Sequence, residues 1–317
     1  MADTVILRNA ESEGTHQPRR AGLRGPTKET VCAVVVTFHP DSGLTERVEK
    51  IARQVSQILI VDNASGALAR EQLRTLCCSL GLALIENSEN RGIAAALNQG
   101  AHWAAGHSYE WMLTLDQDSI VADDMVETLL DVYEKFPAKK RLGAIGSNYV
   151  DRNSSRNFLP RGGSGCWHEV KTLITSGSLI PLSAYALNGP FREEFFVDCV
   201  DLEYCLRARS RKLKLIIARK TLMQHAVGAA TMHRLPWKMT GTSNHSPMRR
   251  YYLGRNLLVL AREYLLREPI WVFSATYSLF KSAILMVFFE NDRACKLKHM
   301  AMGVVDGLFG NFGRKVS

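Results

Sequence analysis

Residues 31–86 alternate between short apolar runs and helical patterns, and this alternation constrains the fold more than any other feature of the sequence. The run at 31–39 is continuous, apolar and rich in β-branched residues, as in a strand that is covered on both faces. Further strands are indicated at 58–65 and 83–86, and helical spacing fills the intervals between the strands. We therefore predict an α/β domain with a mainly parallel, doubly wound sheet, in which ligands bind beyond the carboxyl ends of the strands.

A later apolar run, from Trp111 to Leu115, ends in the two carboxylates Asp116 and Asp118. Side chains alternate along an extended chain, so we expect both acids to point the same way, with Gln117 opposed. Two carboxylates on one side of a strand end repel each other unless a cation lies between them. Hard oxygen ligands suit Mg2+ or Mn2+. An acidic turn without a metal is the alternative interpretation.

Polar side chains also follow the first two strands. Thr37 lies at the end of the first, and Asp62 lies at the end of the second. Further along, Gly92 begins a helix of small residues, and its N-terminus together with Arg91 could face a phosphate group. Ordinary packing of small side chains explains residues 94–96 equally well.

Two downstream segments add candidate groups. Residues 175–178 are a predicted turn that carries hydroxyls and backbone amides, and residues 198–203 hold three acids, Asp198, Asp201 and Glu203. Helical periodicity begins at Asp201, so its carboxylate lies in a first turn, where the helix dipole favours negative charge.

The composition restricts the partners. A formal net charge of +9 favours anionic binding partners, such as nucleotide phosphates or acidic lipid headgroups. Basic and aromatic residues are not interleaved as in nucleic-acid modules, so we expect no nucleic-acid partner. Seven dispersed cysteines lack zinc-site spacing, and the N-terminus lacks the apolar core of a secretory signal. These features suit a reduced, cytoplasmic protein.

We divide the chain into a polar, disordered leader at 1–29, an α/β domain at 30–235 and a helical extension at 236–317. Residues 270–289 of the extension are apolar over nearly the length that spans a bilayer, but Lys281 lies at the middle, where a charge is unfavourable. We expect a helix that lies at the membrane surface or is buried against the core. The flanking cations are Arg249, Arg250, Arg255, Arg262, Arg267, Arg293, Lys296 and Lys298.

Seven motifs occur in a fixed order: Val34-Val-Val-Thr-Phe, Val61-Asp-Asn-Ala-Ser, Asn90-Arg-Gly-Ile-Ala, Asp116-Gln-Asp, Thr175-Ser-Gly, Phe196-Val-Asp-Cys-Val-Asp-Leu-Glu-Tyr and His225. This set resembles family 2 glycosyltransferases of the GT-A fold, which is a Rossmann-like, mainly parallel sheet flanked by helices. Within that family it looks most like bacterial rhamnosyltransferases of rhamnolipid and O-antigen synthesis. Arg250-Tyr-Tyr-Leu-Gly-Arg-Asn-Leu-Leu strengthens the closer match, and the resemblance covers about residues 31–310.

The resemblance implies functional assignments for the strand ends. Thr37 and Asp62 would hold the nucleotide base and ribose, and Arg91 would help to hold the diphosphate. Asp116 and Asp118 fit the family's metal motif, with Asp116 at the substrate side and Asp118 as a metal ligand.

It also implies assignments for the second half of the chain. Asp201 matches the family's general base, and His225 matches a late metal ligand. The substrate site would be completed by Thr175, Ser176, Gly177 and Arg255. Arg255 could equally pack the C-terminal helices.

The expected function is inverting, metal-dependent transfer of L-rhamnose from dTDP-L-rhamnose to a lipid or lipid-linked saccharide. We expect it to take place in the cytoplasm, at the inner face of the membrane. Another nucleotide-sugar donor on the same scaffold is one alternative, and a nucleotide-sugar binding protein without catalysis is the other.

Overall fold

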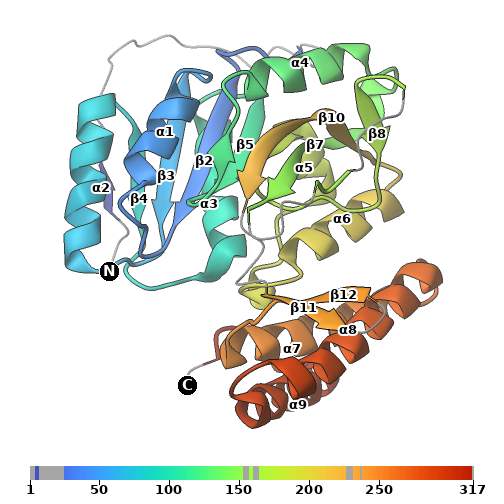
Figure 1. Ribbon diagram of the computed structural model, residues 1–317. Coiled ribbons are helices and arrows are strands. Elements are labelled where there is room, and N and C mark those ends of the chain that lie inside the picture. The colour runs from blue at the N-terminus through green and yellow to red at the C-terminus, as the bar shows by residue number, and fades with distance from the viewer. Residues whose placement is uncertain are drawn as a thin grey trace.

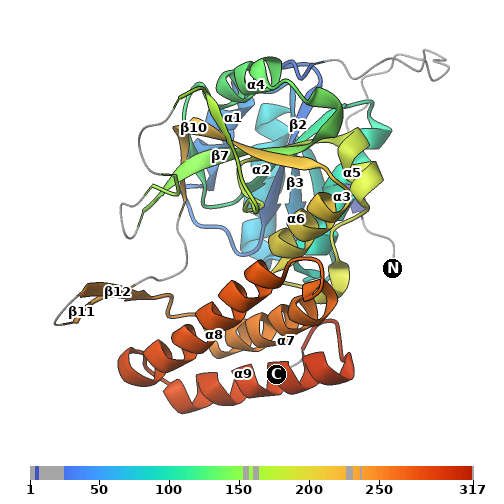
Figure 2. The ribbon, with the colours of Figure 1, turned by 90° about the vertical axis from the view of Figure 1, so that its right-hand side faces the viewer.

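The computed structural model describes residues 4–6, 25–152, 157–159, 164–225, 231–235 and 238–315. Over these residues, one large sheet carries helices on both faces, and three further helices form a separate layer at one end (Figures 1 and 2). The strand order is β1-β4-β3-β2-β5-β9-β7-β10-β6, with β8 paired to β10. The predicted α/β class with a C-terminal helical region is confirmed.

The centre of the sheet is parallel, as the alternation of strands and helices predicts. It consists of β4 (Ala83–Glu86), β3 (Gln57–Asp62), β2 (Val31–Thr37) and β5 (Trp111–Asp116). The register pairs Thr37 with Asp62 and Val36 with Asp116, so the carboxyl ends of three strands are level. This places the polar residues that end each strand along one edge of the sheet.

Antiparallel strands complete the sheet on both sides. At one edge lies β1 (Thr4–Ile6). On the other side, β9 (Ser178–Pro181), β6 (Ile120–Val121) and β8 (Trp167–Glu169) flank a parallel pair made of β7 (Leu142–Asp151) and β10 (Lys214–His225). Strand β1 pairs with β4, so residues 4–6 differ from the disordered leader that we predicted. Strand β10 continues to His225, because its second half pairs with β6 and β7.

The helices form two layers. One face of the sheet packs against α1 (Leu44–Ala52), α2 (Ala67–Leu80) and α4 (Met125–Lys135), and the other packs against α3 (Gly92–Gly106), α5 (Leu182–Asn188) and α6 (Val200–Ser210). Strand β2 shows why both faces are covered, since Val31 and Ala33 enter one core whereas Cys32 and Val34 enter the other. Short 3-10 turns lie at Lys139–Arg141 and Glu193–Phe195.

The C-terminal layer begins with a hairpin. It contains β11 (Thr231–Leu235), β12 (Lys238–Thr242), α7 (Pro247–Tyr264), α8 (Pro269–Phe289) and α9 (Arg293–Phe309). The boundary predicted at 235/236 therefore falls inside this hairpin. Helices α7 and α9 pack backbone to backbone, because a Cβ on Gly303 would lie 2.0 Å from the carbonyl oxygen of Tyr251.

Helix α8 contacts its neighbours along its length and at its end. Val272 is buried in the core, and the Ser282 hydroxyl oxygen accepts a hydrogen bond from Arg250 at 2.7 Å. Glu290, which follows α8, accepts hydrogen bonds from Arg250 at 2.6 Å and from Lys296 at 2.9 Å, and all three side chains are buried. By length and composition α8 could span a bilayer, and 11% of its most apolar stretch is buried. Val272 and Met286 are the positions at which α8 is buried.

Candidate active site

Two acids and a histidine meet where β5 ends. Asp116 ends β5, Asp118 lies in the turn that follows, and His225 ends β10. The short strand β6 follows that turn and pairs with the last residues of β10, which brings His225 beside the two acids. His225 Nε2 lies 3.9 Å from Asp116, and Nδ1 lies 3.7 Å from Asp118. Each residue offers one ligand atom, and the three atoms lie within 4.8 Å of one another.

The donor set fits a divalent cation. Two carboxylate oxygens and an imidazole nitrogen suit Mg2+ or Mn2+. Ligand atoms about 2.1 Å from such an ion lie roughly 3 Å from one another, so small side-chain rotations would close the observed separations. Burial raises the pKa of Asp116, His225 opposes this increase, and Asp118 adds to it. A positive charge between the acids would relieve that repulsion.

Two serines brace the acidic turn. Ser176 Oγ accepts a hydrogen bond from the backbone N–H of Asp116 at 3.1 Å and lies 2.7 Å from Ser119 Oγ. Ser119 Oγ in turn lies 3.3 Å from Nδ1 of His225. Ser176 is buried, so it supports the acidic turn from inside the protein. Ser119 has no predicted role, although it directly follows the Asp-Gln-Asp motif.

The other residues of the predicted turn at 175–178 also hydrogen-bond to β5. Gly177 has φ +74° and donates its N–H to the carbonyl oxygen of Thr114 at 2.7 Å. The Thr114 hydroxyl donates to the carbonyl oxygen of Thr175 at 2.5 Å. Residues 175–177 are thereby fixed against β5, just before the two acids.

Gln117 points away from the metal-binding side and secures a neighbouring strand end. Its amide oxygen accepts the backbone N–H of Phe38 at 2.7 Å, and its amide nitrogen donates to the Phe38 carbonyl at 3.1 Å. The residue between the two acids thus holds the loop after β2 beside them.

The predicted nucleotide residues Thr37 and Asp62 lie together and are fully buried. The Thr37 hydroxyl donates to Asp62 Oδ1 at 2.9 Å, and the backbone N–H of Ser65 donates to Asp62 Oδ2 at 2.9 Å. The Ser65 hydroxyl donates to Asp62 as well, and accepts the His39 N–H at 2.8 Å. These bonds join the loops that follow β2 and β3.

The first turn of α3 contacts the segment that precedes Asp201. Arg91 is exposed at the N-cap of α3. Gly92 has φ +84°, and a Cβ there would lie 2.4 Å from the carbonyl oxygen of Phe196. The next residue, Ile93, donates its N–H to that oxygen at 2.9 Å. Small residues in this turn therefore permit close contact with the loop after Phe195.

Asp201 occupies the first turn of α6, as predicted, and one carboxylate oxygen accepts the Leu202 N–H at 2.8 Å. Burial raises the pKa of Asp201 from 3.8 to about 6. The Leu202 N–H lowers this pKa, whereas the charges of Asp198 and Asp116 raise it. A carboxylate in this environment is a stronger base than one in water.

The other two acids of this segment are ion-paired. Asp198 accepts from Arg249 at 2.6 and 3.2 Å, and Glu203 pairs with Arg207 at 2.8 Å. Of the three acids, Asp201 therefore has the environment expected of a base. Arg249 lies 51 positions from Asp198, and no local pattern in the sequence indicates that they meet.

Arg255 lies inside the protein, with no exposed surface. Its guanidinium donates to the carbonyl oxygens of Glu194, Phe195 and Gly313 at 2.7–3.0 Å. This placement matches the packing alternative and not contact with a phosphate.

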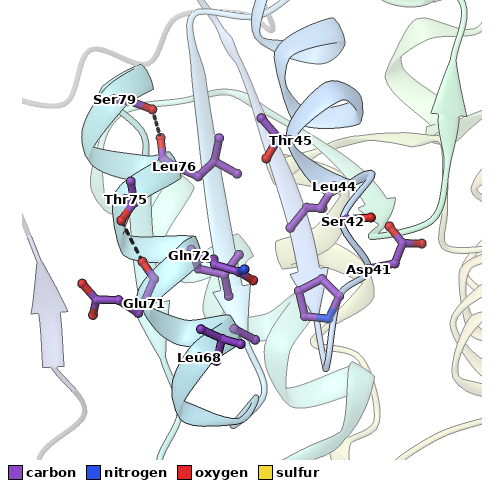
Figure 3. Close-up of a pocket in the computed structure, with 13 residues that line it drawn as sticks. Asp41, Ser42, Leu44, Thr45, Leu68, Glu71, Gln72, Thr75, Leu76 and Ser79 are labelled. Carbon is purple, nitrogen blue, oxygen red and sulfur yellow. Dashed lines mark hydrogen bonds between the residues drawn. The ribbon is translucent and has the colours of Figure 1, made fainter.

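A separate groove of about 430 Å3 lies between α1 and α2 (Figure 3). Apolar side chains such as Leu44, Leu68 and Leu76 line it. Thr75 and Ser79 bond to backbone carbonyls of their own helix, as Figure 3 shows. The acids at the end of β5 do not line this groove, so it is not part of the candidate site.

Comparison with known proteins agrees with this geometry. Residues 32–177 match the model of the family described as glycosyl transferase family 2. The chain is 25% identical over 299 residues to the dTDP-rhamnosyl transferase RfbF of Shigella flexneri, which covers 89% of this chain and 97% of that protein.

Two solved structures share the fold. A TarS fragment of S. aureus has a TM-score of 0.57 and 12% identity, and the match covers 88% of this chain and 80% of that one. The mannosyltransferase PcManGT from Pyrobaculum calidifontis has a TM-score of 0.54 and 16% identity, with 93% and 91% covered. The family model identifies residues 32–177 as a family 2 glycosyltransferase domain, and the fold around it is the one that these GT-A structures share.

Proposed function

We propose that this enzyme is an inverting, metal-dependent rhamnosyltransferase that uses dTDP-L-rhamnose. The observation that carries the proposal is the extent of the match to a dTDP-rhamnosyl transferase. That match covers 89% of the chain, whereas the general family model covers residues 32–177. The similarity to that protein therefore extends beyond the family model into the C-terminal region.

Asp201 is the proposed general base. It takes the proton of the acceptor hydroxyl as that oxygen attacks the sugar carbon and the nucleotide diphosphate leaves. The sugar carbon has oxocarbenium character in this step, as in glycoside hydrolysis. A single displacement inverts the configuration at the sugar. Support comes from the pKa of about 6, which keeps Asp201 ionised at neutral pH while making it a stronger base than an ordinary carboxylate.

Asp118 and His225 are the proposed metal ligands, with Asp116 at the substrate side of the same site. A bound Mg2+ or Mn2+ would neutralise the charge that develops on the leaving diphosphate. The convergence of the three ligand atoms supports this assignment. The P. calidifontis mannosyltransferase with the same fold was solved with GDP-Man and Mn2+.

The remaining predicted substrate residues fall into two groups, one exposed and one buried. Arg91 is exposed and is the proposed cation for the diphosphate. Thr37 and Asp62 are buried, so we propose that they shape the base and ribose site through the backbone ends of β2 and β3. Thr175, Ser176 and Gly177 act from behind the acids by bracing β5.

Helix α8 supports a membrane-bound acceptor. Large apolar side chains recur along it at intervals of three and four, and each is well exposed: Ile270, Phe273, Tyr277, Phe280, Ile284 and Phe288. Such a stripe on one side of a helix is typical of a segment that lies in a membrane surface. Lys281 is exposed as well, which disfavours a full span. We propose that α8 docks the enzyme on the cytoplasmic face of the membrane, close to a lipid or lipid-linked acceptor.

The cations that could assist docking are fewer than the sequence predicts. Arg262, Arg267, Arg293 and Lys298 are exposed and can meet acidic headgroups. In contrast, Arg250, Arg255 and Lys296 are buried in contacts within the protein. Each exposed cation near the surface contributes about 1 kcal/mol to membrane attraction.

A donor screen by thermal shift in the presence of Mg2+ or Mn2+ tests the proposal. A donor at 100 times its dissociation constant stabilises the native state by about 2.7 kcal/mol. We expect dTDP-L-rhamnose to raise the melting temperature more than UDP-glucose or UDP-galactofuranose at equal concentration. A larger shift with a UDP-sugar would assign another donor to the same scaffold. Donor binding without hydrolysis or transfer would instead indicate a binding protein.

A further inference from the structure

The segment that leads into Asp201 has an uncommon backbone. Phe196, Asp198 and Cys199 have φ angles of 64°, 60° and 61°, a region that side chains other than glycine rarely adopt. The N–H of Val197 donates to the carbonyl oxygen of Phe195 at 2.7 Å, which closes a γ-turn of the strained, positive-φ type around Phe196. Such conformations persist where the surrounding structure holds them, and they cluster at functional sites.

Asn256 of α7 makes most of these restraining contacts. Its amide nitrogen donates to the carbonyl oxygens of Phe195, Val197 and Asp198 at 2.9–3.0 Å. The neighbouring Arg255 donates through Nε to Asn256 Oδ1 at 2.9 Å, which fixes the amide so that its nitrogen faces the segment. Both side chains have no exposed surface, so these contacts are made away from solvent.

Other residues of α7 hold the same segment. Arg255 donates to the carbonyl oxygens of Glu194 and Phe195 at 2.9 and 3.0 Å. The ring of Tyr252 stacks on Phe196 with centroids 5.2 Å apart. Arg249 pairs with the carboxylate of Asp198 at 2.6 Å. The strained backbone is thus held from the C-terminal layer, and the Ile93 N–H of α3 donates to the Phe196 carbonyl oxygen as well.

The segment determines where α6 begins. Cys199 is its N-cap, and the Cys199 carbonyl oxygen accepts the Glu203 N–H at 2.9 Å, the first turn of the helix. Asp201 lies inside that turn, so a shift of residues 195–199 moves its carboxylate. An error of about 1 Å in the place of a reacting group can lower a rate by roughly 100-fold.

We propose that Arg249, Arg255 and Asn256 are positioning residues that set the place of Asp201 through residues 195–199. This inference rests on the proposed role of Asp201 as the base. It gives the C-terminal layer a part in turnover that is independent of membrane docking. It also explains why the motif from Arg250 to Leu258 has a buried cation, Arg255, next to a buried amide, Asn256.

The test compares turnover with nucleotide affinity in the full-length enzyme. Asn256→Asp keeps the shape of the side chain and its contact with Arg255, but it removes the donor amide. We expect kcat to fall by about 10- to 100-fold, while the dissociation constant for dTDP with Mn2+ stays within twofold. Rates are expressed per dTDP-binding site, so that unfolded protein does not contribute.

Asn98→Ala is the matched control. Asn98 is also buried, and it donates to the Phe191 carbonyl oxygen at 2.8 Å and to Glu193 at 2.9 Å, upstream of the strained segment. We expect this variant to lose thermal stability and to keep kcat. An equal loss of kcat in Asn98→Ala and Asn256→Asp would overturn the positioning role, as would an unchanged kcat or weaker dTDP binding in Asn256→Asp.

Arg249→Gln decides the matter if Asn256→Asp does not fold, because Arg249 is partly exposed and its loss leaves no buried void. A lower kcat with unchanged dTDP affinity supports the proposal, and an unchanged kcat or weaker affinity contradicts it. Asp201→Asn is measured in parallel. Normal turnover in that variant would exclude Asp201 as the base. This would be a failure of the proposed function, distinct from a failure of the positioning role.

Discussion

Replacing Asp201 with asparagine should stabilise the protein while abolishing transfer. Burial raises the pKa of Asp201 from 3.8 to about 6, so its ionised form is disfavoured in the native state. One pKa unit corresponds to about 1.4 kcal/mol, and the shift therefore lowers the free energy of unfolding by up to about 3 kcal/mol at pH 7.5. Asparagine has nearly the same shape and carries no charge, so the variant regains this energy.

The pH dependence identifies the cause. The unfolded carboxyl titrates near pH 4 and the native one near pH 6, so the native penalty is absent below pH 4 and grows between pH 4 and 6. Above pH 6 it is constant. We expect the variant to melt roughly 5 °C higher than the parent at pH 7.5, and at the same temperature at pH 4.

The assay is thermal unfolding of both proteins across pH 4–8, together with turnover at pH 7.5. Turnover should fall by at least about 100-fold, because general base catalysis contributes 100- to 10,000-fold. Asp198→Asn is the control, since it removes a carboxylate that Arg249 holds at 2.6 Å and should bring no gain in stability. A gain that is absent or independent of pH would refute the reasoning, and near-normal turnover would move the base to Asp198 or Glu203.

Other expected outcomes follow from the same geometry. Asp118→Ala and His225→Ala should each shift the metal titration of activity by at least about tenfold, and an unchanged titration would exclude that residue as a ligand. Since Asp201 must be ionised to accept a proton, kcat should decline as pH falls through about 6, and a flat profile from pH 5 to 8 would contradict its role. Phe280→Glu, on the exposed side of α8, should abolish flotation with anionic vesicles and leave dTDP binding intact. High salt or alkaline carbonate should release the parent from membranes, whereas retention after both washes would indicate a true span.

The sheet centre is predictable from the sequence because each strand there is a local pattern. The apolar runs that contain Val34 and Ile60 have helices on both faces, and that burial leaves a continuous apolar signature. Strand β9 and the far half of β10 lack such a signature. Their register depends on strands that lie far away in the chain, such as the pairing of Gln224 with Ile120. Non-local pairing of this kind has no short-range pattern to reveal it.

The site shows the same division. Asp116 and Asp118 are predictable as a pair because they follow one strand, and Asp201 is predictable as the acid of a first helical turn. His225 lies beside the acids because β10 pairs with β6. No local pattern predicts this pairing, so only the resemblance to a family indicated His225 as a ligand. Arg255 shows the limit of composition, since a cation in a basic, aromatic helix is as suited to phosphate as to backbone carbonyls. Its burial decides between the two.

The most direct test of the proposed rhamnosyl transfer is the release of dTDP from dTDP-L-rhamnose, followed with Mg2+, with Mn2+ and with a chelator. A matched series with UDP-glucose and UDP-galactofuranose supplies the comparison. We expect turnover with dTDP-L-rhamnose that requires the metal, is lost in Asp201→Asn, and exceeds the rate with either UDP-sugar. Equal or faster turnover of a UDP-sugar, or a rate that the chelator leaves unchanged, would contradict the proposal.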